Sequence, residues 1–137
     1  MNISGRCDYA CRAMLELATR YESATPVSAQ TIAAARNIPE KYLTQIMLQL
    51  KRAGLVHSVR GAQGGYTLAG RPNKLSVLQI IEAVDGPVLN ITAKDDAGSS
   101  EITVLWNAIG RDISTALNRF TLAKMLDMIS DSTMFHI

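Results

Sequence analysis

The segment from residue 55 to residue 68 constrains the fold more than any other part of this 137-residue chain. Two short runs of β-prone residues, 55–60 and 66–68, flank the glycine-rich sequence Gly61-Ala62-Gln63-Gly64-Gly65. Glycines between two such runs supply the positive φ angles of a tight turn, so the segment predicts a β-hairpin. A phosphate-binding loop is the alternative, but such a loop leads into a helix and ends in a lysine–serine pair, which does not follow here.

Helices are predicted on the amino-terminal side of this hairpin. Apolar residues recur at helical spacing in three stretches, 6–21, 29–36 and 39–53. Ser28 is a favourable N-cap for the second stretch, Pro39 suits the first turn of the third, and Gly54 is a natural C-terminal stop. Two short helices that meet at a tight turn and lead into a hairpin form the winged helix-turn-helix pattern.

The chain after the hairpin is also predicted to be helical. Ser76 and Gln79 form a capping box for a fourth helix, which ends at Gly86-Pro87. A polar stretch precedes a long helix over about residues 101–120, and Thr121 caps a short helix over 122–129. The predicted fold class is therefore mainly α with a small β-hairpin.

The net charge of +2 hides an uneven distribution of charges. Residues 36–74 carry seven basic side chains and one acid, whereas residues 75–101 carry five acids and one lysine. A basic segment beside an acidic one suggests a polyanion-binding surface next to a region with another task. The composition, 47% hydrophobic and 19% charged, excludes a disordered chain.

The third predicted helix has an apolar face and a polar face. The polar face carries Lys41, Thr44, Gln45 and Leu48. Lysine and glutamine have the reach and the donors to address base edges or phosphates in the major groove. Lys51 and Arg52 suit phosphate contacts, and Arg60 in the hairpin can enter a minor groove. Each side chain alone is compatible with an ordinary solvated surface, but together with the hairpin they favour duplex DNA as the partner.

Five segments of the sequence form a recognisable set: 7–13, 37–46, 50–56, 58–66 and 80–87, the last of which contains Glu82-Ala83-Val84-Asp85-Gly86-Pro87. Together they resemble the Rrf2 family of winged-helix transcription regulators. The resemblance implies a homodimer that acts on a palindromic operator, more often as a repressor. It also implies base-reading roles for Lys41, Thr44 and Gln45, a minor-groove role for Arg60, and a phosphate-facing helix that begins at Ser28. Thr44 departs from the glutamate often found at its position, so the operator sequence cannot be borrowed from other members.

The resemblance further implies that long helices cross to form the dimer interface. On this basis the chain divides into a winged helix-turn-helix domain at 1–75, a connecting helix and sensor-type loop at 76–100, dimerisation helices at 101–130 and a tail at 131–137. The residues expected at the interface are Ile102, Leu105, Trp106, Ile109, Ile113, Leu117 and Phe120. Trp106 is expected to anchor the interface, with the wall of a small ligand pocket as the alternative.

Iron–sulfur members of the family carry three cysteines in the loop before the long helix, but residues 90–101 contain no cysteine here. Because cluster binding rests on thiolate ligands, we predict no cofactor, and the family cluster is expected to be absent. Cys7 and Cys11 lie four residues apart on one helix, a spacing unsuited to a disulfide, and are interpreted as free thiols on its inner face. The alternative is a redox-sensing or metal-sensing site of Cys7, Asp8 and Cys11, completed by a partner subunit.

The remaining function classes are weakly supported. Neither of the two histidines lies beside an evident nucleophile, and no paired-carboxylate or metalloprotease spacing appears, so no enzyme is predicted. No apolar run is long enough to cross a bilayer, and free thiols without a targeting signal favour the cytoplasm. The expected partners are duplex DNA and a second copy of the chain, and a small-molecule effector is compatible with the sequence. A winged-helix module that binds protein instead of DNA is the alternative, although its binding face would carry apolar rather than basic residues.

Overall fold

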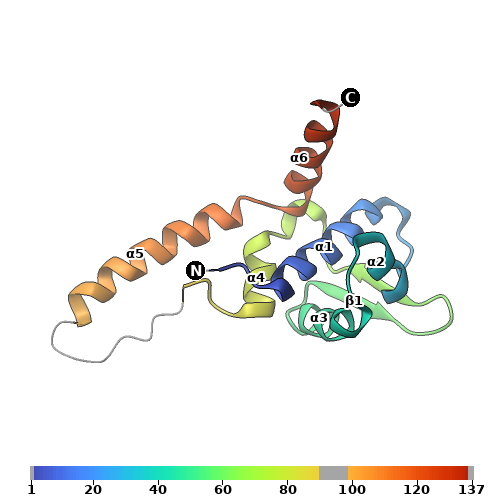
Figure 1. Ribbon diagram of the computed structural model, residues 1–137, viewed down its shortest axis with the longest axis horizontal. Helices are drawn as coiled ribbons and strands as arrows, with labels where there is room; N and C mark the ends of the chain where they lie inside the picture. Colours follow the sequence, from blue (N-terminus) through green and yellow to red (C-terminus); the bar gives the residue numbers. More distant parts are fainter. Residues whose placement is uncertain (1, 90–98, 136–137) are drawn as a thin grey trace.

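The computed structural model describes residues 2–89 and 99–135 (Figure 1). Within these ranges the molecule is mainly helical, with one two-stranded antiparallel sheet, which confirms the predicted fold class. The elements in chain order are α1 (Gly5–Thr19), the 3-10 helix η1 (Tyr21–Ser23), α2 (Ala29–Arg36), α3 (Glu40–Arg52), β1 (Val56–Val59), β2 (Gly65–Leu68), the 3-10 helix η2 (Pro72–Lys74), α4 (Val77–Asp85), α5 (Ser99–Asn118) and α6 (Leu122–Phe135).

Helix α1 runs through the centre of the molecule and packs against α2, α3, α4 and α6. Its N-cap is Ser4, whose hydroxyl accepts a hydrogen bond from the backbone N–H of Cys7 at 3.0 Å. The inner residues of α1 that are at most 5% exposed are Cys7, Ala10, Ala13, Met14, Leu17 and Ala18. Each large apolar side chain in this core contributes about 1.5–3 kcal/mol by its removal from water. The core therefore fixes α1 as the frame on which the helix-turn-helix rests.

The capping residues of α2 and α3 define the helix-turn-helix. The Ser28 hydroxyl accepts from the backbone N–H of Thr31 at 3.1 Å, as its predicted N-cap role requires. Asn37 ends α2 in the left-handed conformation with φ of 55°, which asparagine tolerates better than most residues. Pro39 then occupies the N-cap position of α3, one residue before the helical turn where it was expected.

The hairpin that follows α3 is the wing of the fold. Its register pairs Val56 with Leu68 and Val59 with Gly65. Val27, which precedes α2, exchanges two backbone hydrogen bonds of 2.9 Å with Tyr66 of β2. Gly65 has a φ of +153°, and a Cβ there would overlap the backbone of Val27, so the close approach requires glycine. The wing is thus joined to the segment that opens α2.

The carboxyl-terminal helices extend from this body (Figure 1). The predicted capping box of Ser76 and Gln79 is present at the start of α4. Helix α5 begins at residue 99, and α6 continues to residue 135, beyond the predicted end at 129, so residues 131–135 are helical and not a tail. The sequence after Gly110 contains no glycine or proline that would end α6 earlier. The predicted sensor-type loop falls largely outside the described residues.

Candidate nucleic-acid interface

Helix α3 separates its apolar and polar faces as the sequence predicts. The residues that are at most 1% exposed are Leu43, Ile46, Met47 and Leu50. Lys41, Thr44 and Gln45 are exposed on the other face. Leu48 lies on the same face and is 43% exposed, although it is apolar. The polar face is therefore open to a partner, and its one leucine suits contact with a thymine methyl group.

The polar face of α3 and the wing border the same groove. This hollow has a volume of about 420 Å³ and is lined by Lys41, Thr44, Gln45, Leu48, Lys51, Ser58 and Tyr66. The first five of these residues come from α3, and the last two come from β1 and β2. Four of the seven predicted DNA-contacting residues thus converge on one concave surface, at which basic and amide groups are the principal donors.

The other predicted contact residues lie around this groove rather than in it. Arg52 ends α3 and is exposed. Arg60 is exposed directly after β1, where the wing turns through a backbone hydrogen bond of 3.0 Å from Gly64 to Gly61. The Ser28 hydroxyl is half-buried and contacts the Thr31 hydroxyl at 2.8 Å, so it is occupied in holding the first turn of α2.

Tyr42 is a contact candidate that the sequence pattern did not reveal. Its side chain is 44% exposed at the start of α3, and its ring stacks on that of Tyr9 of α1 with centroids 6.2 Å apart. The Lys41 ammonium lies 4.9 Å from the centre of the Tyr42 ring. Such a cation–π contact restricts the lysine before any partner binds. The two tyrosines are far apart in sequence, so no local pattern signals this stack.

Four charged residues at intervals of four lie along α1 and its C-cap, and none of them was among the predicted DNA-contacting residues. Asp8 pairs with Arg12 at 2.7 Å, and Glu16 pairs with Arg20 at 2.5 Å. Arg12 donates to the backbone carbonyls of Arg36 and Asn37, at 3.5 and 3.4 Å, and so caps the end of α2. The spacing itself was visible as two i, i+4 pairs, and it predicts one charged stripe on α1.

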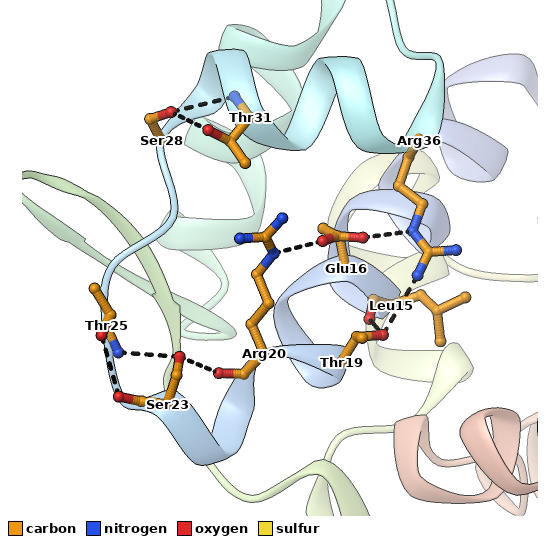
Figure 2. A network of polar contacts seen from close by, with 9 residues as sticks. All are labelled: Leu15, Glu16, Thr19, Arg20, Ser23, Thr25, Ser28, Thr31 and Arg36. Carbon is orange, nitrogen blue, oxygen red and sulfur yellow. Dashed lines mark hydrogen bonds and ion pairs between the residues drawn. The ribbon is translucent and has the colours of Figure 1, made fainter.

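Glu16 is the centre of a polar network between α1 and α2 (Figure 2). Its residue exposure is 6%, and its second oxygen accepts from Arg36 Nε at 2.9 Å. Arg36 also donates to the Thr19 hydroxyl at 3.3 Å. Burial acts to raise the pKa of Glu16, but the hydrogen bonds from Arg20 and Arg36 outweigh it, and the pKa lies below the ordinary value. A buried carboxylate thus holds the ends of two helices together.

Cys7 is buried and Cys11 is half-buried, and neither forms a disulfide. A hydrogen bond from Cys11 lowers the pKa of Cys7, and the same contact raises the pKa of Cys11. Asp8, the third candidate sensor residue, is exposed and paired with Arg12. Across residues 2–89 and 99–135, no group of three or more His, Cys, Asp or Glu side chains could hold a metal ion.

The apolar stripe of α5 is incompletely covered by its own chain. Ile102 and Leu105 are each 49% exposed and Trp106 is 38% exposed. The expected interface residues that are half-buried are Ile109, Ile113, Leu117 and Phe120. A helix that leaves this much apolar surface in water is typical of a protein interaction site. Within the described ranges, no helix is long and apolar enough to cross a membrane.

The geometry defines a class of protein: a winged helix-turn-helix whose recognition helix and wing share one basic groove is a DNA-binding transcription regulator. Residues 3–128 match the Rrf2 family, described as "Iron-dependent Transcriptional regulator". The chain belongs to the Rrf2 family.

Named relatives support this assignment along the whole chain. The HTH-type transcriptional regulator CymR of Bacillus subtilis is 34% identical over 140 residues, which covers 100% of both chains. The regulator IscR of Vibrio atlanticus is 34% identical over 131 residues, covering 92% of this chain and 75% of the relative. These relatives are transcriptional regulators, and no enzymatic activity is indicated.

Solved structures have the same fold. CymR (YrzC), the global cysteine regulator of B. subtilis, superposes with a TM-score of 0.79 at 32% identity, over 93% of this chain and 98% of that one. IscR of T. potens gives a TM-score of 0.75 at 35% identity, over 96% and 90% of the two chains. The winged helix-turn-helix inferred from the sequence is thereby confirmed.

Proposed function

We propose that this regulator is a homodimer that represses transcription by occupying a palindromic operator. The observation that carries the proposal is the shared groove, in which the polar face of α3 and the two strands of the wing meet. Each subunit inserts α3 into the major groove, where Lys41, Thr44 and Gln45 address base edges. Lys51 and Arg52 bind phosphates, and Arg60 enters the adjacent minor groove.

The dimer is proposed to form through α5. Its exposed apolar residues, with Trp106 among them, are the surface that a second copy would cover. A two-fold axis between the subunits presents two α3 helices to one face of the duplex, which is the reason that the operator should be palindromic. The dimer is proposed to act in the cytoplasm, where DNA is reached and thiols stay reduced.

No iron–sulfur cluster is part of the proposed function, although the family description includes iron dependence. The cysteines of the sequence are Cys7 and Cys11, both on α1, and residues 90–101 contain none. Two thiols four residues apart on a rigid helix do not supply the four ligands that a cluster needs. The donor set therefore does not fit the cluster, and no step of the proposed mechanism passes through one.

Selection from a pool of random DNA duplexes tests the function. The recovered sequences should contain two inverted half-sites whose centres are separated by about 10 base pairs or a multiple of that spacing. A promoter that carries the recovered site should be transcribed less when the protein is added. Recovery of no preferred sequence, together with stable capture of a protein partner by the α3 face, would instead support a winged-helix protein-interaction module.

Redox sensing or metal sensing through Cys7 and Cys11 is the second candidate function. The hydrogen bond between the two thiols, which lowers the pKa of Cys7, is the observation that favours it. Metal analysis and an absorption spectrum of protein purified without oxygen test the metal form of this function. A bound metal that is lost in Cys7→Ser and in Cys11→Ser would support the metal form, and metal-free protein would refute it.

A further inference from the structure

Arg20 has a partly used guanidinium group near the DNA-binding elements. It follows α1 directly, its Nε donates to Glu16, and its side chain is 43% exposed. Among the described residues, no hydrogen-bond or ion-pair partner is found for its two terminal nitrogens. Figure 2 shows these nitrogens turned toward the start of α2, where Ser28 and Thr31 lie. An arginine with a free fork is suited to bidentate contact with an oxyanion.

Arg20 borders a cavity between α2 and the tip of the wing. This cavity has a volume of about 300 Å³, and its lining residues are Arg20, Thr25, Pro26, Val27, Ser28, Thr31, Ala62, Gln63 and Gly64. Among the part of the chain that the structure describes, the lining residues include an arginine, three hydroxyl groups and an amide but no carboxylate. Arg20 therefore gives the cavity a positive charge with no carboxylate among the lining residues, and its two terminal nitrogens are the donors that an anion would meet. Its wing residues, Ala62, Gln63 and Gly64, closely follow Arg60 in the chain, so the cavity lies at the same end of the wing as that arginine.

Glu16 fixes the direction of Arg20. The carboxylate side chain is 8% exposed, and it is shared between Arg20 and Arg36 of α2. A long side chain loses rotamer entropy when it is ordered. Because the Nε contact with Glu16 already restricts Arg20, part of that entropy is lost on folding and need not be lost on binding.

We propose that Arg20 binds a backbone phosphate of the DNA duplex, and that Glu16 is the residue that positions it. The inference rests on the proposed function, because it places one further phosphate-binding residue at the same protein–DNA interface. Arg20 lies outside α3, so it strengthens binding to every sequence and reads none. Glu16 acts through Arg20 and does not itself touch the DNA.

The salt dependence of DNA binding tests this assignment. Fluorescence anisotropy of a labelled mixed-sequence duplex of about 30 base pairs gives the slope of log affinity against log salt, whose magnitude falls by about 1 for each phosphate that the protein no longer neutralises. Arg20→Gln should flatten the slope by about 2 per dimer, since one phosphate per subunit is released. Arg119→Gln is the matched control, because it removes an exposed arginine at the junction of α5 and α6, and it should leave the slope unchanged.

The Glu16→Gln variant distinguishes a role of Glu16 in positioning Arg20 from a purely electrostatic effect of the Glu16 charge. Removal of a negative charge near DNA should strengthen binding by Coulomb's law, whereas release of Arg20 from its fixed direction should weaken binding and flatten the slope. In the double variant E16Q/R20Q the affinity should not fall below that of Arg20→Gln alone, because both substitutions act on the same phosphate interaction. Circular dichroism checks that each variant is folded, and Arg20→Gln alone decides the assignment if Glu16→Gln does not fold.

Each outcome refers to one of the two proposals. An unchanged slope in Arg20→Gln would overturn the role of Arg20, and tighter binding by folded Glu16→Gln would overturn the positioning role of Glu16. Failure of the unsubstituted chain to bind any duplex would refute the proposed function itself. Binding by the unsubstituted chain with a flattened slope in Arg20→Gln supports both.

Discussion

Replacement of Glu16 by glutamine measures how strongly the buried carboxylate holds α1 to α2. Glutamine keeps the size of the side chain but turns an N–H group toward one of the two arginines. A hydrogen bond to a charged group contributes about 1.5–3 kcal/mol. The exposure of Arg20 and Arg36, 43% and 28%, reduces that contribution through solvent screening. We therefore expect Glu16→Gln to lower the free energy of unfolding by about 1–2 kcal/mol at pH 7.

The pH dependence of this loss identifies its cause. Because the pKa of Glu16 is lower in the folded chain than in the unfolded chain, the unfolded chain binds the proton first as the pH falls. The stabilisation is fully present above the ordinary glutamate pKa, about 4.3, and is lost as the pH falls through the folded-state pKa. Urea unfolding of both proteins at pH 7 and near pH 3, at one protein concentration, should show a smaller difference in acid. An equal difference at both pH values would refute the ion-pair explanation.

Three substitutions test the DNA and dimer surfaces. Arg60→Ala should weaken operator binding about tenfold or more in a gel-shift titration without changing the thermal midpoint, and unchanged binding would contradict the role of the wing. Gln45→Ala should reduce discrimination between operator and random DNA by about 1–3 kcal/mol, whereas an equal loss of both affinities would mean that Gln45 only positions the protein. Ile113→Glu should dissociate the dimer in sedimentation, because it places a charge on the apolar stripe of α5; an intact dimer would argue against α5 as the interface.

The features that could be predicted from the sequence depend on residues close together in the chain. The N-cap at Ser28 and the capping box of Ser76 and Gln79 each join residues three positions apart, so the amino-acid types suffice to recognise them. Gly54 adopts a φ of 78° directly after α3, where a stop was expected. The two faces of α3 follow from the helical period in the same way.

The features that could not be predicted join distant residues. Arg36 reaches Glu16 across 20 positions, and Tyr9 stacks on Tyr42 between two different helices. Before the fold is known, a glutamate four residues from an arginine is most simply interpreted as an exposed surface pair. Burial distinguishes Glu16 from such pairs, and burial is set by the packing of α2 over α1. The close approach of Val27 to Gly65 is hidden for the same reason.

The residues proposed to read DNA are distinct from those that hold α3 in place. Lys41, Thr44 and Gln45 are exposed, so substitutions there change the groove and leave the core intact. The orientation of the helix-turn-helix depends on α1, from which Arg12 caps α2 and Glu16 pairs with Arg36. Changes on the exposed face of α3 should therefore alter the preferred sequence at nearly constant stability. Loss of the Arg12 cap on α2 should instead weaken binding to all duplexes together, because it moves the whole reading surface.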